Sequence, residues 1–286
     1  MASTDSAART VAFQPPRRGM GGLYPDRLLR YRRPRWWQEF GLIAIGYWLY
    51  GLGRNAVPEQ ASIAIRHGRT IQHIQDLLRL NFERSLNHFV AANEWLAQIM
   101  NYYYATLHFI VTAGTLIWLF FAHPSVYRGG RTVLAVTTVV ALVGFYLYPL
   151  APPRLMPEYG YIDTLIKFHT WGSLANPKIA EHSNQFAAMP SLHIGWAVWS
   201  ATAIVICARR TWVRALGALY PVGTLLAIVG TANHFILDAV GGVIVVLIGL
   251  TGQWLMSGRG AFTPPPDAPP RAPVPRPRLL AHSAAP

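Results

Sequence analysis

The sequence predicts an all-α integral membrane protein, a bundle of six transmembrane helices with two short amphipathic helices on the outer side. Hydrophobic residues make up 52% of the 286 residues and charged residues only 13%, whereas soluble domains carry about 25% charged residues. The apolar residues gather in six stretches, each close to the roughly 20 residues that a helix needs to cross a bilayer. Basic residues outnumber acidic ones by 25 to 12, and they are concentrated in alternate connecting segments.

These stretches divide the chain into three parts. Residues 1–35 form a basic N-terminal segment, residues 36–256 a six-span membrane domain, and residues 257–286 a proline-rich tail that we expect to be disordered. The predicted spans are residues 36–52, 102–122, 132–150, 190–208, 213–230 and 234–256, of which the first is the shortest.

The placement of arginine predicts the orientation of the spans. Arginines are concentrated in the N-terminal segment, in the connections after the second and fourth spans, and in the tail. Positively charged segments stay on the cytoplasmic side, so we expect both termini in the cytoplasm. The same bias explains the basic excess better than nucleic-acid binding, which we do not expect. Lysine is rare beside arginine, as in GC-rich bacterial genomes, which favours a multi-pass protein of the plasma membrane.

The long connection between the first two spans, residues 53–101, is not an unstructured loop. Its apolar residues recur at helical spacing between charged residues and indicate two short amphipathic helices that lie on the outer surface or cap the bundle. Binding of a partner protein is the less common alternative. The apolar positions are Ile71, Ile74, Leu77 and Leu78, followed by Leu86, Phe89, Val90 and Leu96.

Two histidines stand at the beginning of predicted spans on the same outer face. His193 ends the string MPSLH, and His234 opens the string HFILD. Ionisable groups at the end of a span are costly and usually functional. Asp238 lies four residues after His234, on the same helical face, where a carboxylate fixes the tautomer and leaves the other ring nitrogen free to attack or accept a proton. His193 is then the candidate for the complementary acid and base.

The same helix starts predict an anion site. Helix N-termini carry unpaired N–H groups and a partial positive charge, so two that converge favour phosphate. Ser191 and Asn233 add hydrogen-bonding groups at this level, and Arg154 in a proline-rich outer loop suits phosphate binding, although a lipid-headgroup anchor is its alternative role. A zinc site formed by His193, His234 and Asp238 is possible on ligand type, but the anion site explains the same residues better. We therefore expect neither a metal nor a cofactor.

Together these motifs resemble those of the type 2 phosphatidic acid phosphatase superfamily. PPRL from Pro152, MPSLH from Met189 and NHxxxD from Asn233 are most similar to the branch that includes the fungal inositol phosphorylceramide synthases, and the resemblance covers residues 102–256. It implies that His234 is a nucleophile that forms a phosphohistidine and that Asp238 orients it. It further implies that His193 protonates the leaving group and then activates the acceptor, and that Arg154 binds phosphate oxygens.

The chain departs from the superfamily pattern at three positions. The lysine expected before Arg154 is missing, since Lys167 and Lys178 both follow it. Leu192 replaces a usual glycine, and Ile228 replaces a usual arginine. The synthase-like branch tolerates these changes. A histidine near a tyrosine-rich run also fits that branch, which makes His108 a possible accessory residue.

The resemblance implies a membrane-embedded phosphatase or phosphotransferase for a lipid phosphate, among membrane lipids, with its active site on the extracytoplasmic side. The acceptor is either water or an alcohol such as inositol, and the residues do not separate the two. The alternative is a non-catalytic lipid transporter or lipid-binding membrane protein. Transporters carry polar groups near the middle of the bilayer, whereas here they cluster at one face, which favours the enzyme.

Overall fold

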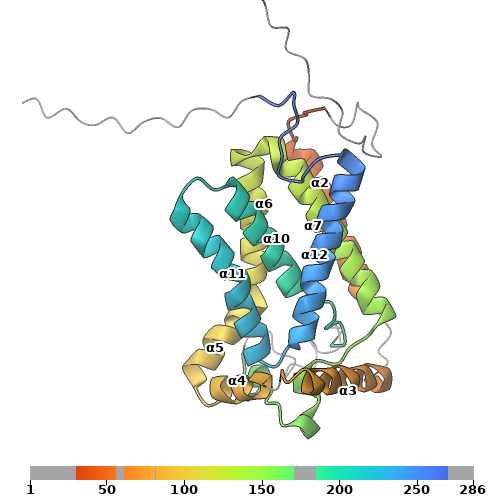
Figure 1. The fold of residues 1–286 in the computed structure, drawn as a ribbon, viewed down its shortest axis with the longest axis vertical. Helices are drawn as coiled ribbons and strands as arrows, with labels where there is room; N and C mark the ends of the chain where they lie inside the picture. The colour runs from red at the N-terminus through yellow and green to blue at the C-terminus, as the bar shows by residue number, and fades with distance from the viewer. Residues whose placement is uncertain (1–29, 56–60, 81, 171–184, 270–286) are drawn as a thin grey trace, which may run out of the picture.

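The computed structural model describes residues 30–55, 61–80, 82–170 and 185–269, and within them the chain is helical without a β-strand (Figure 1). Its helices are α2 (Trp36–Asn55), α3 (Ala61–Leu77), α4 (Phe82–Ala91), α5 (Glu94–Tyr102), a π-helical turn (Tyr103–Leu107), α6 (His108–Ala122), α7 (Pro124–Leu147), α8 (Thr164–Lys167), α10 (Leu192–Cys207), α11 (Thr211–Gly230) and α12 (Ile236–Ser257). Two 3₁₀ turns, Pro153–Leu155 and Pro157–Tyr159, follow α7.

The helices form one bundle with two different ends. Helices α2, α6, α7, α10, α11 and α12 run along the bundle, while α3 and α4 lie at its lower end in this view (Figure 1). Residues 30–35 and 258–269 lie at the opposite end. We call these ends the α3 end and the terminal end.

Among the described residues, four helical segments are long and apolar enough to cross a membrane, so the chain is that of a multi-pass membrane protein. They are Glu94–Ala122, Pro124–Leu147, Thr211–Gly230 and Ile236–Ser257. Helix α10 is apolar but shorter than these four segments. Helix α2 is not among the four, and most of its large apolar side chains are exposed on the surface of the bundle. The count of six spans and the location of α3 and α4 on the outer side remain predictions.

Several predicted helix boundaries were wrong, for local reasons. Helix α7 begins at Pro124 instead of residue 132, because proline suits the first position of a helix. The second predicted span continues a helix that begins at Glu94, where the Asn93 side chain accepts the N–H of Leu96 at 3.1 Å. Helix α12 begins at Ile236, so His234 precedes the helix instead of lying in its first turn.

The chain packs on the bundle beyond the last helix. Ala261 and Phe262, the first apolar residues of the predicted tail, are buried in a cluster with Leu119 and Tyr127. The carbonyl of Ala261 comes so close to Gly129 that a Cβ there would lie 2.2 Å from the oxygen. Residues 258–262 therefore belong to the folded domain, while the rest of the tail from residue 270 lies outside the described residues.

Close contacts through glycine bring α7, α10 and α12 together. A Cβ on Gly242 of α12 would lie 2.5 Å from the carbonyl oxygen of Ser191, and one on Gly249 would lie 2.5 Å from the hydroxyl of Thr137 on α7. Small residues let membrane helices approach in this way. Consequently the beginning of α10, which carries His193, lies beside the beginning of α12, which His234 precedes by two residues.

Candidate active site

His234 and His193 meet at the beginnings of α12 and α10. The Nε2 atom of His234 lies 3.3 Å from Nδ1 of His193, and the centroids of the two rings are 5.3 Å apart. On its other side, Nδ1 of His234 lies 3.2 Å from the carboxylate of Asp238, a fully buried side chain. The structure thus joins the three residues that the sequence singled out into one chain of contacts.

Asp238 holds this chain in place through its position in the first turn of α12. The Oδ2 atom that faces His234 also accepts the backbone N–H of Phe235 at 2.9 Å. An aspartate at this position satisfies a helix N–H and is favoured by the helix dipole. Since an ionised carboxylate can only accept, Nδ1 of His234 carries the proton in this contact and Nε2 presents its lone pair.

A backbone hydrogen bond sets the two helix starts in register. The N–H of Ser191 donates to the carbonyl of Asp238 at 2.9 Å. The buried hydroxyl of Ser191 accepts the N–H of Ile194 and caps α10. This cap explains why α10 begins at Leu192, two residues after the predicted start.

The predicted pair of free helix N-termini is only half present. At the beginning of α12 the N–H groups of Phe235, Ile236 and Leu237 all have side-chain acceptors. At the beginning of α10, by contrast, no acceptor is recorded among the described residues for the N–H groups of Leu192 and His193. The expectation of unpaired N–H groups on both helices was therefore wrong for α12, and the open donors belong to α10.

Asn233 stabilises the turn before α12. Its side-chain nitrogen donates to the hydroxyl of Thr231 at 2.8 Å, and its own backbone N–H donates to the carbonyl of Ile228 at 2.9 Å. Like Ser191, it is buried and already has local partners. Both residues thus shape the site, and the phosphate contacts predicted for them remain untested.

Arg154 lies against the same turn from the loop after α7. Its backbone N–H donates to the carbonyl of Ala232 at 2.9 Å, and its Nη1 atom lies 3.1 Å from the carboxylate of Asp163. The side chain is only 6% exposed, and its Nε atom has no partner among the described residues. A buried guanidinium with an open donor is suited to an anion.

His108 lies on the far side of His193, in a position that the sequence did not define. Its ring centroid is 4.2 Å from that of His193, and the ring of Tyr104 stacks on His193 at 4.4 Å. Both residues flank or belong to the π-helical turn Tyr103–Leu107, and such turns occur frequently at functional sites. Three histidines therefore stand in a row from α6 to α12.

A buried polar network beneath α12 was missed by the sequence analysis. Glu83 on α4 is 1% exposed and accepts the N–H of Ile236. Gln75 on α3 donates to Glu83 at 2.9 Å and accepts the N–H of Leu237 at 3.1 Å, while the hydroxyl of Tyr161 donates to Glu83 at 3.4 Å. Burial raises the pKa of Glu83 to about 7, with a smaller contribution from the charge of Asp238. No sequence motif marks Glu83, since the network is assembled from four separate segments.

The arrangement of His193, His234 and Asp238 can be tested against that of zinc ligands. Within the described residues, no group of three His, Cys, Asp or Glu side chains has the arrangement of metal ligands. The site instead combines two histidines in contact, a carboxylate behind one of them, and free backbone and guanidinium donors nearby. Such a set suits proton transfer and nucleophilic attack at an anionic centre.

The apolar helices define a multi-pass helical membrane protein. A family model described as the PAP2 superfamily matches residues 69–252, and the chain belongs to this superfamily of membrane lipid phosphatases and phosphotransferases, as the motifs predicted. The chain is also 26% identical over 131 residues to a phosphoinositol dihydroceramide synthase of Bacteroides thetaiotaomicron. That alignment covers 41% of this chain and 42% of the relative, so less than half of the relative's length is matched. No solved structure matches the chain significantly.

Proposed function

We propose that the protein transfers a substituted phosphoryl group of a lipid through a phosphohistidine on His234. The observation that carries this proposal is the contact chain from Asp238 through His234 to His193, with spacings of 3.2 and 3.3 Å. It gives His234 an oriented lone pair on Nε2 and places a second imidazole beside that atom.

In the first step, Nε2 of His234 attacks phosphorus and the lipid oxygen departs with the proton of His193. In the second step, His193 removes a proton from the acceptor hydroxyl, whose oxygen displaces His234 from phosphorus. The two imidazoles are too close for a phosphate to fit between them, so the substrate phosphate replaces their direct contact. Asp238 holds the Nδ1 proton of His234 throughout.

Phosphate oxygens are held by the free donors around the histidines. The N–H groups of Leu192 and His193 lie at the positive end of α10 and have no recorded acceptor in the described residues. The open Nε of Arg154 adds a charged donor, and its ion pair with Asp163 keeps the guanidinium in place. Fixed donors of this kind stabilise the charge of the transition state without rearrangement.

The acceptor that we favour is an alcohol. The bacterial relative is named for the synthesis of phosphoinositol dihydroceramide, which supports a head-group transferase of the inositol phosphate type. Water as the acceptor would make the protein a lipid-phosphate phosphatase. The arginines at the terminal end favour a cytoplasmic location for that end, which supports chemistry at the extracytoplasmic face of the plasma membrane.

The test uses purified protein with a labelled lipid phosphate, with and without inositol and a long-chain sphingoid alcohol. We expect label in a new lipid or inositol product only when the alcohol is present. Release of free phosphate at an equal rate with and without alcohol would refute the transferase. His234→Ala should abolish turnover while expression and lipid binding persist. A non-catalytic lipid-binding protein has no turnover to lose, so this result separates the enzyme from that alternative. Unchanged turnover would refute the nucleophile assignment.

A further inference from the structure

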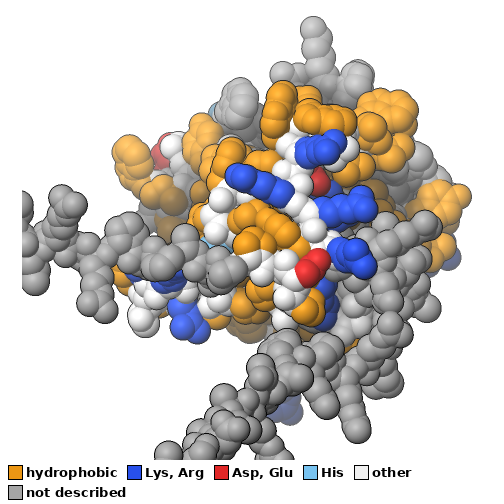
Figure 2. Space-filling model, turned by 90° about the horizontal axis from the view of Figure 1, so that it is seen from above, with side chains coloured by type: hydrophobic (Ala, Val, Ile, Leu, Met, Phe, Trp, Pro, Cys, Tyr) orange, Lys and Arg blue, Asp and Glu red, His pale blue; other side chains and the backbone are white. Residues whose placement is uncertain are grey.

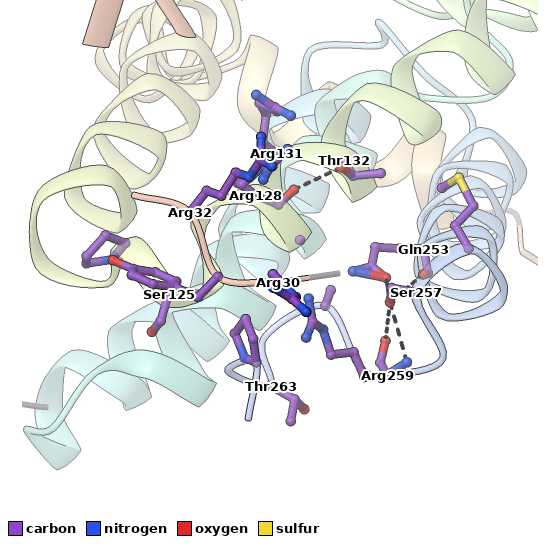
Figure 3. Close-up of a pocket in the computed structure, with 16 residues that line it drawn as sticks. Arg30, Arg32, Ser125, Arg128, Arg131, Thr132, Gln253, Ser257, Arg259 and Thr263 are labelled. Carbon is purple, nitrogen blue, oxygen red and sulfur yellow. Dashed lines mark hydrogen bonds between the residues drawn. The ribbon is translucent and has the colours of Figure 1, made fainter. Parts of the chain in front are cut away.

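A second polar site lies at the terminal end, on the opposite side of the molecule from the histidines. A cavity of about 240 Å³ opens between residues 30–32, the beginning of α7, the end of α12 and the segment after it (Figure 3). Helix α12 has 22 residues, so the cavity lies about 33 Å along the helix from its first turn. The cavity is therefore separate from the proposed active site. Its charged lining residues are Arg30, Arg32, Arg128, Arg131 and Arg259.

The acidic groups near this cavity are too few to neutralise it. Glu39 forms an ion pair with Arg131, and the carboxylate of Asp267 accepts the backbone N–H of Tyr31 and lies near Arg259. Five guanidinium groups thus face two carboxylates within the described residues. Figure 2 shows this end of the molecule with several basic side chains gathered on it and few acidic ones.

Arg128 and Arg259 are also close enough for their charges to interact. Burial lowers the pKa of Arg259; the charge of Asp267 partly offsets this, and the neighbouring charge of Arg128 adds a smaller lowering. Like charges are held together at a cost unless a counterion joins them. In Figure 3, Arg30 and Arg259 approach the cavity from different segments, and Arg128 lies on a third.

Neutral donors and a helix start complete the lining. Pro124 and Ser125, the first residues of α7, line the cavity, and the N-cap His123 supplies no side-chain cap. The positive end of the α7 dipole therefore faces the same space as the guanidinium groups. Thr263, in the segment after α12, also lines the cavity.

We propose that this cavity binds a phosphate group, either as the headgroup of an anionic lipid or as a free phosphate compound. The bias of arginine toward the cytoplasmic side explains basic residues at this end, but it requires no convergence on a cavity. Here residues 30–32, α7 and residue 259 are distant in sequence and meet around one space. Guanidinium groups from several directions match the tetrahedral array of phosphate oxygens. This proposal is independent of the proposed function.

The test compares three substitutions, each made in full-length protein that also carries His234→Ala. Arg128→Gln and Arg30→Gln each remove one guanidinium from the cavity. Arg214→Gln is the matched control, because Arg214 is an exposed arginine on the first turn of α11 and does not line the cavity. Binding of vesicle-derived phosphatidylglycerol, of phosphatidylcholine and of inorganic phosphate is measured on each protein by native mass spectrometry and calorimetry, all in a His234→Ala background.

We expect the wild-type cavity and Arg214→Gln to bind with equal affinity, and Arg128→Gln to bind about tenfold more weakly, as for the loss of one charge-assisted contact. Dependence on Arg128 for phosphatidylglycerol alone identifies a lipid headgroup as the ligand, and the same dependence for inorganic phosphate identifies a free phosphate compound. Equal binding by all variants, or no binding to any of them, overturns the proposal. Arg30→Gln lies outside the helices, so it gives the same answer if Arg128→Gln impairs folding.

Discussion

Glu83 makes the stability of this protein depend on pH in a defined window. Its pKa lies at about 7 in the folded protein against an ordinary 4.5. Between these values the folded protein holds a proton that the unfolded chain has lost, so stability decreases as the pH rises. Below pH 4.5 the carboxyl is neutral in both states and the cost is absent. Above pH 7 it is ionised in both states, and the full cost is about 3 kcal/mol.

The substitution Glu83→Gln removes this dependence because the amide does not ionise. We expect the difference in unfolding free energy between wild type and variant to change by about 3 kcal/mol from pH 4.5 to pH 8.5, in favour of the variant at high pH. Part of the variant's gain in unfolding free energy is offset at every pH. The side-chain nitrogen of Gln75 donates to the carboxylate of Glu83 in the wild type, and in the variant it faces an amide instead. The titratable groups that interact with Glu83 are Asp238 and Tyr161, and both are present in the two proteins.

The assay is thermal unfolding in detergent, followed by near-ultraviolet circular dichroism at half-unit steps of pH. Glu94→Gln is the control, because Glu94 is an exposed carboxylate in the first turn of α5 and should leave the profile unchanged. A profile of Glu83→Gln parallel to that of wild type between pH 4.5 and 8.5 would refute the assignment of a buried, protonatable carboxyl beneath α12.

Two further substitutions test the architecture around the histidines. Gly242→Ala should destabilise the protein by about 1–3 kcal/mol and reduce turnover, because its Cβ would lie 2.5 Å from the carbonyl of Ser191 and separate α10 from α12; Gly114→Ala, with open space around it, should change neither. Thermal unfolding and turnover of the same samples check both, and equal effects of the two variants would contradict the close contact. Asp238→Asn should lower turnover by about 10³–10⁴-fold with little change in substrate binding, by analogy with an aspartate that sets a histidine tautomer elsewhere; a turnover within tenfold of wild type would remove Asp238 from the mechanism.

The general class of the fold followed from hydropathy because span length is set by the thickness of the bilayer. Boundaries followed less well, since local capping decides them. Pro124 begins α7 eight residues before the apolar stretch that predicted it, and Ser191 delays α10 by two residues. Burial of Phe262 depends on its packing against Leu119 of α6 and Tyr127 of α7, which the composition of a proline-rich tail does not reveal.

The meeting of His193 and His234 was predictable because each begins an apolar stretch on the same side. The residues that support them were not. Gln75 and Glu83 reach α12 from α3 and α4, about 150 positions earlier in the chain, and their spacing resembles that of any polar residue on a surface helix. Only the packing of α3 and α4 against the bundle converts them into acceptors for the first N–H groups of α12.

This support explains why the two helix starts differ in chemistry. At the beginning of α12 the N–H groups donate to the side chains of Asp238, Glu83 and Gln75. These bonds hold the segment next to His234 firmly, and the same N–H groups are not available to a ligand. The first turn of α10 keeps the N–H groups of Leu192 and His193 open. In the proposed function, orientation of the nucleophile and recognition of phosphate would thus be divided between two helices. A substrate phosphate should accordingly bind nearer to α10, beside the imidazole that protonates its leaving group.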